Sequence, residues 1–345
     1  MKRFLNSYLF HVLSMVLFTA AALYFTLKNQ WKEVVEVLLH VHPFGLLLVF
    51  LLAISGQCLL GWILQTLTCL CKKDYRFDQG LVNALVASFF HGITPGASGG
   101  QVAQMFVFSR QGVPVSESAS ILWMDFIIYQ SCMSLTALVL LLLRFKRFSV
   151  SGGSIYVLVF LGFLVNLCVI IGLWALAHMK PVYTWITTTG LELGVRLHLI
   201  KDRTKALSSL NAQLEHFEIE KNRLKQHKLT VLKTCCLNLV RQFLTYSMPF
   251  FCALALGVDV QFDQFIDMMA LCSFVSMINC FILVPGASGG TEAAFIYMFS
   301  LIFDKIEAAG IMILWRFCTY YFIMIIGGLA FLIQKFQIFH DERGK

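Results

Sequence analysis

The chain has 345 residues, of which 58% are hydrophobic and only 13% are charged, and its formal net charge is +8. Apolar runs recur along it that are long enough to cross a hydrocarbon core of about 30 Å, which takes about 20 helical residues. This composition excludes an ordinary soluble domain and indicates a polytopic membrane protein. The basic excess is expected to set topology and to attract anionic lipid headgroups, and we expect no nucleic-acid partner.

Hydropathy predicts an all-α membrane protein with six spans, at about residues 9–27, 44–71, 115–143, 154–177, 230–256 and 306–333. The first apolar run has no small-residue cleavage site, so we expect it to stay attached as an anchor. Two further segments, at about 77–112 and 262–303, each contain two short apolar runs separated by a break. Runs this short favour re-entrant hairpins built from half-helices over complete spans.

Both predicted hairpins are interrupted by the same six residues, PGASGG, at 95–100 and 285–290. Proline removes a backbone donor, and glycine permits conformations that other residues avoid. Polar backbone exposed to hydrocarbon is costly, so such a break is expected to be buried in protein or to line a wet cavity. A helix beginning near Gly100 or Gly290 would direct free N–H groups and the positive end of its dipole at an anion. The alternative is that small residues only allow close helix packing.

The order of these features indicates an internal duplication with inverted topology. The triplet FDQ occurs at 77–79 and at 262–264, SF follows after eight residues in both places, and the PGASGG motifs lie 190 residues apart. The expected repeats are residues 1–150 and 151–345.

Loop Lys and Arg residues favour the cytoplasmic side of a membrane. If segment 77–112 turns back, the connector at about 178–229, with nine basic and five acidic residues up to Lys228, falls inside. Both termini are then cytoplasmic. The acidic stretch GVDVQFDQFID lies outside, together with the basic RFKRF at 144–148, which disagrees with the rule. The connector also has an amphipathic helical stripe, which predicts either a helix on the membrane surface or a plain solvated linker.

Four ionisable residues lie within apolar segments, where a charge usually faces a partner or a polar path: Asp125, Arg241, Glu292 and Arg316. Asp125 and Arg316 hold similar positions in the two repeats and could pair with each other. Arg241 could bind a phosphate or neutralise Glu292. The candidate substrate-binding set adds residues of the two motifs and their followers: Pro95, Gly96, Ser98, Gly99, Gly100, Gln101, Gln104, Pro285, Gly286, Ser288, Gly289, Gly290 and Thr291. We predict no catalytic residue, metal site or cofactor, and interpret the 11 cysteines as reduced packing residues.

The stretches TPGASGGQVAQMF and VPGASGGTEAAFIYMF, each followed by a long apolar run, resemble the membrane domain of the lysyl-phosphatidylglycerol synthase/flippase family. The resemblance covers nearly the whole chain and implies a protein that moves an aminoacylated phospholipid across the bilayer. In two-part members a separate cytoplasmic domain transfers lysine from charged tRNA to phosphatidylglycerol. We expect no such domain here, because Lys345 follows shortly after the last predicted span. Gln101 and Gln104 follow the first motif where Glu292 follows the second, so the two hairpins need not bind alike.

Three functions stay open on the sequence. The first is a flippase for an anionic or aminoacylated phospholipid, such as lysyl-phosphatidylglycerol, or a related lipid phosphate, with the headgroup held between the hairpin helices and Arg241. The others are a carrier of a small soluble anion and a phosphatidylglycerol lysyltransferase. The chain shows no Ser/His/Asp or Cys/His constellation and no nucleotide-binding loop, which disfavours the enzyme. A homodimer and a separate synthase partner are both compatible with the sequence.

Overall fold

The computed structural model describes residues 39–94, 98–144, 227–279 and 284–343, with a few isolated positions between these ranges, and side chains as far as residue 334. The predicted spans at 9–27 and 154–177 and the connector at 178–229 lie wholly or largely outside the described residues. So does Pro95 of the first motif.

The described residues form long helices that match the predicted spans closely. These are α3 (Pro43–Thr68), α6 (Val115–Leu143) and α11 (Lys228–Ala255). The last predicted span is divided into α14 (Lys305–Arg316), the π-helical turn η4 (Phe317–Tyr321) and α15 (Phe322–Arg343). By length and composition α3, α6 and the continuous stretch Lys305–Gln334 could each cross a membrane. The helical class is confirmed for the described residues, whereas the count of six spans stays a prediction.

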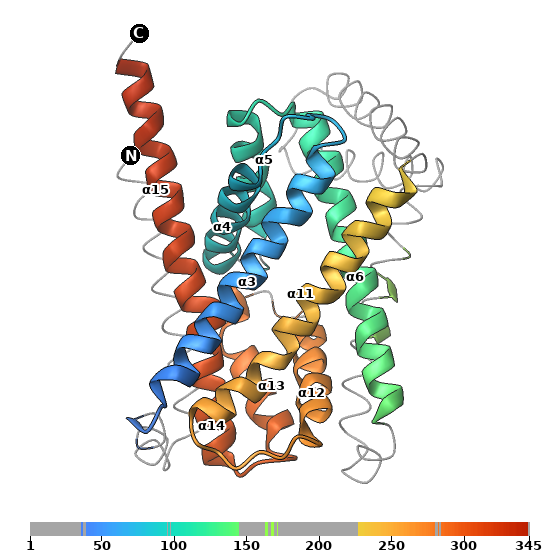
Figure 1. Ribbon diagram of the computed structural model, residues 1–345, viewed down its shortest axis with the longest axis vertical. Helices are drawn as coiled ribbons and strands as arrows, with labels where there is room; N and C mark the ends of the chain where they lie inside the picture. Colours follow the sequence, from blue (N-terminus) through green and yellow to red (C-terminus); the bar gives the residue numbers. More distant parts are fainter. Residues whose placement is uncertain are drawn as a thin grey trace, which may run out of the picture.

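Each PGASGG motif separates two shorter helices that pack against each other. The first pair is α4 (Phe77–Ile93) and α5 (Ser98–Arg110). The second is α12 (Gln264–Ile278) and α13 (Gly290–Phe299), with the 3-10 turn η3 (Pro285–Ala287) between them. The two pairs lie toward opposite ends of the molecule (Figure 1), and α4 contacts η3.

The order of long helix, broken pair and long helix therefore occurs twice, as α3 to α6 and as α11 to the continuous stretch that begins with α14 and ends with α15. This is the order that an internal duplication predicts. Re-entry of the two pairs into a bilayer and the inverted topology of the repeats remain predictions.

The breaks depend on residues with positive φ. Gly96, Gly286 and Gly289 have φ angles of 57°, 61° and 86°. L-residues seldom adopt this region, because the Cβ atom approaches the following carbonyl oxygen, so glycine is favoured there. Local sequence thus determines where the helices stop.

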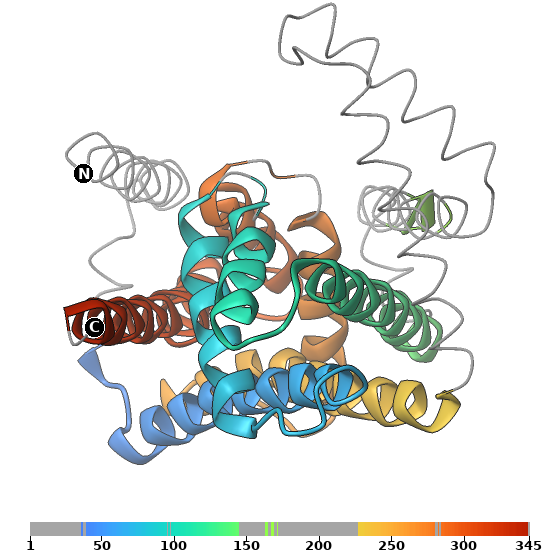
Figure 2. The same ribbon diagram turned by 90° about the horizontal axis from the view of Figure 1, so that it is seen from above.

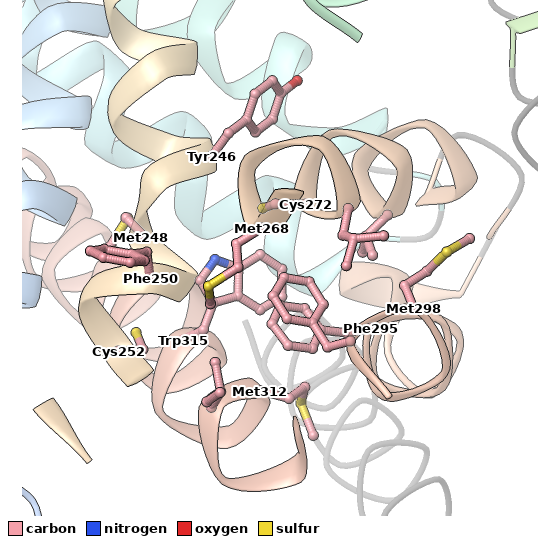
Figure 3. Close-up of a cluster of buried hydrophobic side chains, with 14 of the residues drawn as sticks. Tyr246, Met248, Phe250, Cys252, Met268, Cys272, Phe295, Met298, Met312 and Trp315 are labelled. Carbon is pink, nitrogen blue, oxygen red and sulfur yellow. The ribbon is translucent and has the colours of Figure 1, made fainter. Parts of the chain in front are cut away.

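The largest buried hydrophobic cluster joins α11, α12, α13 and α14 (Figure 3). Phe295 of α13 stacks on Trp315 of α14 with ring centroids 4.8 Å apart. On the other side of α11, α3 crosses close by (Figure 2). A Cβ atom on Gly45 of α3 would lie 2.7 Å from atoms of Ala255, so only glycine allows this approach. α11 is therefore held from both sides, which fixes the position of Arg241.

Arg144, the first residue of the basic loop that disagrees with the positive-inside rule, is compensated by acidic neighbours. Its Nε lies 3.1 Å from Oδ1 of Asp267, whose side chain is fully buried at the start of α12. Its Nη2 donates to the carbonyl oxygen of Asp263 at 2.8 Å. The arginine therefore shares one end of the molecule with the acidic stretch, as the topology predicts, and its charge is neutralised there.

Candidate functional site

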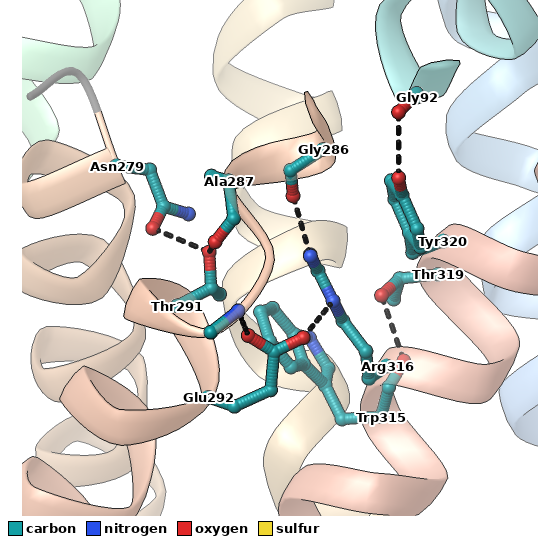
Figure 4. A network of polar contacts seen from close by, with 11 residues as sticks. Gly92, Asn279, Gly286, Ala287, Thr291, Glu292, Trp315, Arg316, Thr319 and Tyr320 are labelled. Atoms are coloured by element: carbon teal, nitrogen blue, oxygen red, sulfur yellow. Dashed lines mark hydrogen bonds and ion pairs between the residues drawn. The ribbon is translucent and has the colours of Figure 1, made fainter. Parts of the chain in front are cut away.

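The second break is closed by a buried ion pair at the beginning of α13 (Figure 4). Oε2 of Glu292 accepts a hydrogen bond from the backbone N–H of Gly289 at 2.6 Å, and Oε1 accepts one from Nε of Arg316 at 3.0 Å. Arg316 also donates to the carbonyl oxygen of Gly286. The Glu292 and Arg316 side chains are only 1% and 8% exposed. The positive end of the α13 dipole is thus occupied by a carboxylate of the protein itself.

The other polar groups of the second motif are also enclosed by protein. The hydroxyl of Thr291 lies 2.8 Å from Oδ1 of Asn279 and 2.9 Å from the carbonyl oxygen of Ala287. Thr291, Ser288 and Pro285 are all buried. Glu292 and Thr291 are therefore satisfied by other groups of the protein, whereas the buried Oγ of Ser288 has no hydrogen-bond partner among the described residues.

Tyr320, in the π-helical turn η4, connects the two breaks. Its hydroxyl donates to the carbonyl oxygen of Gly92, near the end of α4, at 2.9 Å. Its ring centre lies 4.1 Å from Cζ of Arg316, a cation–π contact. A single side chain therefore joins the first break to the ion pair of the second. π-helical turns inside α-helices occur frequently at functional sites.

The first break is more open than the second. Oγ1 of Thr94 accepts from the N–H of Gly99 at 2.9 Å and donates to the carbonyl oxygen of Phe90 at 2.6 Å, so it stabilises the turn into α5. Ser98 and Gln101 are exposed. No carboxylate follows this motif, in contrast to Glu292 in the second.

The remaining residues of the first motif have mixed environments. Gly96 is exposed, whereas Gly100 and Gln104 are buried. The backbone carbonyl of Gln104 accepts a hydrogen bond from Asn83 at 3.4 Å. The ring of His91 occupies the space that a side chain on Gly100 would fill. Close packing and an open polar surface are therefore both present at this break.

Arg241 lies about halfway along α11 and is half-buried. Its Cζ is 5.4 Å from the ring centre of Tyr129 on α6, a cation–π contact. Within the described part of the chain its guanidinium forms no ion pair and donates no hydrogen bond. It lies within electrostatic range of His91 at the first break and of Asp125 on α6.

Asp125 has a buried Oδ1 atom with no hydrogen-bond partner among the described residues. Tyr129, whose ring contacts the Arg241 guanidinium, lies four residues after Asp125 on the same face of α6. The sequence suggested that Asp125 could pair with Arg316 and that Arg241 could neutralise Glu292. The structure instead pairs Arg316 with Glu292, and it leaves Arg241 without an ion pair in the described part of the chain, with Asp125 within electrostatic range.

The sequence interpretation missed the two aromatic contacts of this region. Tyr320 lies four residues after Arg316, and Tyr129 lies four residues after Asp125, the spacing that places side chains on one helical face. This spacing could have predicted both aromatic contacts. No group of three or more His, Cys, Asp or Glu residues that could hold a metal occurs within the described ranges.

Comparison with known proteins extends over almost the whole chain. A family model described as the lysylphosphatidylglycerol synthase TM region matches residues 12–327. The chain is also 25% identical over 288 residues to a UPF0104 membrane protein of Archaeoglobus fulgidus, an alignment that covers 83% of this chain and 85% of that protein. The matched residues include both broken helix pairs and all four ionisable candidates. The chain therefore belongs to the family of the lysylphosphatidylglycerol synthase TM region.

Proposed function

We propose that this protein is a lipid flippase, which moves a phospholipid with an anionic or aminoacylated headgroup across the membrane. The observation that carries the proposal is Arg241, a half-buried cation in the middle of a long helix that has no carboxylate partner in the described part of the chain. A charge in a membrane segment is costly and usually serves a substrate path. Its guanidinium matches the geometry of a phosphate, which it can bind through two parallel hydrogen bonds.

Comparison with two other arginines supports this assignment. Arg316 and Arg144 each pair with a buried carboxylate, of Glu292 and Asp267 respectively. Both of these arginines are therefore held inside the protein by an ion pair, and each also donates a hydrogen bond to a backbone carbonyl oxygen. The donors of Arg241 are available. The first break, whose His91 lies within electrostatic range of Arg241, presents exposed polar residues instead of a closed ion pair.

The surroundings of Arg241 favour a lipid over a small soluble anion. Val240 and Phe243, which flank Arg241 in the sequence of α11, are 50% and 51% exposed in the described structure. Arg241 contacts α6, so the helix presents apolar side chains on faces next to the one that bears the cation. This arrangement suits a substrate whose phosphate enters the protein while its acyl chains stay in the bilayer. Translocation would follow from movement of the two repeats against each other around this site.

The test uses protein reconstituted into liposomes with fluorescently labelled phosphatidylglycerol, and measures how fast the label becomes accessible to an impermeant quencher. We expect the wild type to accelerate exchange and Arg241→Ala to abolish the acceleration. Lys233→Ala is the matched control, because Lys233 lies on the same helix but stacks on Trp62, 5.5 Å from the ring centre. It should retain transport.

Two results would overturn the proposal. Transport that is unchanged in Arg241→Ala would remove this residue from the site. Uptake of inorganic phosphate into the same liposomes, without lipid exchange, would identify a soluble-anion carrier instead. Thermal unfolding of each variant, measured in parallel, separates loss of transport from loss of fold.

A further inference from the structure

We propose that the lipid bound at Arg241 has a net negative charge and that it binds together with one proton, which Asp125 takes up. The inference rests on the proposed function and names both the substrate class and the coupling ion. It starts from two observations. A buried carboxylate oxygen of Asp125 has no hydrogen-bond partner in the described structure, and the Arg241 guanidinium lies 5.4 Å from the ring centre of Tyr129, one helical turn after Asp125 on the same face of α6.

Arg241 thus contacts the face of α6 that carries Asp125, and the two groups form no ion pair in the described structure. A phosphate bound to Arg241 would therefore come close to Asp125. An ionised Asp125 would repel the phosphate. A protonated one can donate a hydrogen bond to a phosphate oxygen, because a neutral carboxyl group has one O–H donor. Protonation thus converts Asp125 from a competitor for Arg241 into a second ligand of the headgroup.

The charge balance of the region leads to the same result. Arg241 and Arg316 balance Asp125 and Glu292, so these four residues carry no net charge when all are ionised. A bound phosphodiester anion would leave the group at −1, and uncompensated charge at membrane depth is strongly disfavoured. One proton on Asp125 restores neutrality. The proton comes from water and forms the carboxyl O–H bond, and no bond of the lipid is broken.

Other charged groups on the elements packed against α6 are engaged elsewhere. Lys233 of α11 stacks on Trp62, and Arg110 of α5 lies over Phe106. Asp267 of α12 pairs with Arg144, and α3 contains no charged residue between Pro43 and Thr68. His91 of α4 also has a titratable side chain within electrostatic range of Arg241, so a variant of His91 supplies a control.

The experiment measures binding of fluorescent phosphatidylglycerol to the purified full-length protein in detergent micelles, from about pH 4, near the ordinary pKa of an aspartate side chain, to about pH 9. Below the pKa of Asp125 the affinity should not depend on pH. Above it the affinity should fall about tenfold per pH unit, because one proton is linked to each bound lipid. Phosphatidylcholine, which has no net charge, should bind more weakly and without this slope.

Three variants test whether Asp125 is the residue that takes up the proton. Asp125→Asn mimics the protonated state and should bind phosphatidylglycerol with no pH dependence. Asp125→Glu keeps a titrating carboxyl group, so its affinity should still depend on pH, with a shifted midpoint. This variant replaces Asp125→Asn in the test if the asparagine variant does not fold. His91→Gln should behave like the wild type.

The outcomes separate this inference from the proposed function. A slope in Asp125→Asn equal to that of the wild type, a slope lost in His91→Gln, or wild-type binding that is independent of pH would overturn the role of Asp125. Equal binding of phosphatidylcholine would overturn the charge selection. If Arg241→Ala still bound phosphatidylglycerol normally, the headgroup site itself would be wrong.

Discussion

Replacement of Arg316 by alanine is expected to destabilise the protein strongly. The variant would leave Glu292 buried at 1% exposure with one of its two hydrogen bonds lost. It would also remove the donor to the carbonyl oxygen of Gly286 and the cation that packs on the Tyr320 ring. The remaining bond, from the N–H of Gly289 at 2.6 Å, cannot compensate a full negative charge.

The magnitude follows from this stranded carboxylate. Removal of one partner of a buried ion pair lowers the free energy of unfolding by about 3–5 kcal/mol. Arg241→Ala provides the comparison, because within the described structure the packed contact of the Arg241 guanidinium is the cation–π contact with Tyr129, at 5.4 Å. Loss of such a contact is worth about 0.5–2 kcal/mol. The two arginine variants should therefore differ clearly in stability.

A double variant tests whether the uncompensated charge of Glu292 causes this loss of stability. Glu292→Gln retains an oxygen that can accept from Gly289, and Arg316→Met fills a similar volume without charge. Combining the two removes both charges together, and replacement of a buried pair by uncharged groups is often close to neutral. We therefore expect the double variant to recover most of the stability lost in Arg316→Ala.

The assay is equilibrium unfolding of the purified protein in mixed micelles with increasing sodium dodecyl sulfate. Tryptophan fluorescence reports the transition, since Trp315 is buried beside the ion pair. Wild type, Arg316→Ala, Arg241→Ala and the double variant are compared under the same conditions. The reasoning fails if Arg316→Ala is no less stable than Arg241→Ala, or if the double variant is as unstable as Arg316→Ala.

Three further predictions concern topology and the contact between the breaks. A cysteine at the exposed position Ser116 should react with an impermeant thiol reagent only from the cytoplasm, and one at Lys305 only from outside; reaction of both from one side would refute the inverted arrangement. Gly286→Ala should lower the free energy of unfolding by about 1–2 kcal/mol, because Gly286 has a positive φ of 61°. It should also abolish lipid exchange, because the new Cβ atom displaces the Tyr320 hydroxyl. Wild-type stability and wild-type lipid exchange in this variant would contradict the prediction. Tyr320→Phe, which removes the bond to Gly92, should lose about 0.5–1.5 kcal/mol while altering lipid exchange, and unchanged exchange would show that this bond is only structural.

Local features of the sequence determined where the helices run and where they stop. Hydropathy alone placed the helix at 115–143 with the bounds that the structure has, and the helices near 44–71 and 230–256 to within three residues. The two breaks were also predictable, because proline and glycine act on their own backbone whatever surrounds them. The π-helical turn within the last predicted span was not, since no proline or glycine marks residues 317–321.

Only the tertiary structure decided which charges meet and why the two identical motifs differ. Arg316 pairs with Glu292 across 24 residues, and Arg241 on α11 lies in range of Asp125 on α6, contacts that depend on how the helices cross. The six residues PGASGG have the same intrinsic tendency to interrupt a helix at both positions. At the second motif, the Glu292 carboxylate accepts hydrogen bonds from the N–H of Gly289 and from Arg316. At the first motif, Gln101 is exposed. The environment of each break is set by side chains that follow the motif and by helices packed against it, because electrostatic pairing is a property of distance in space and not of spacing along the chain.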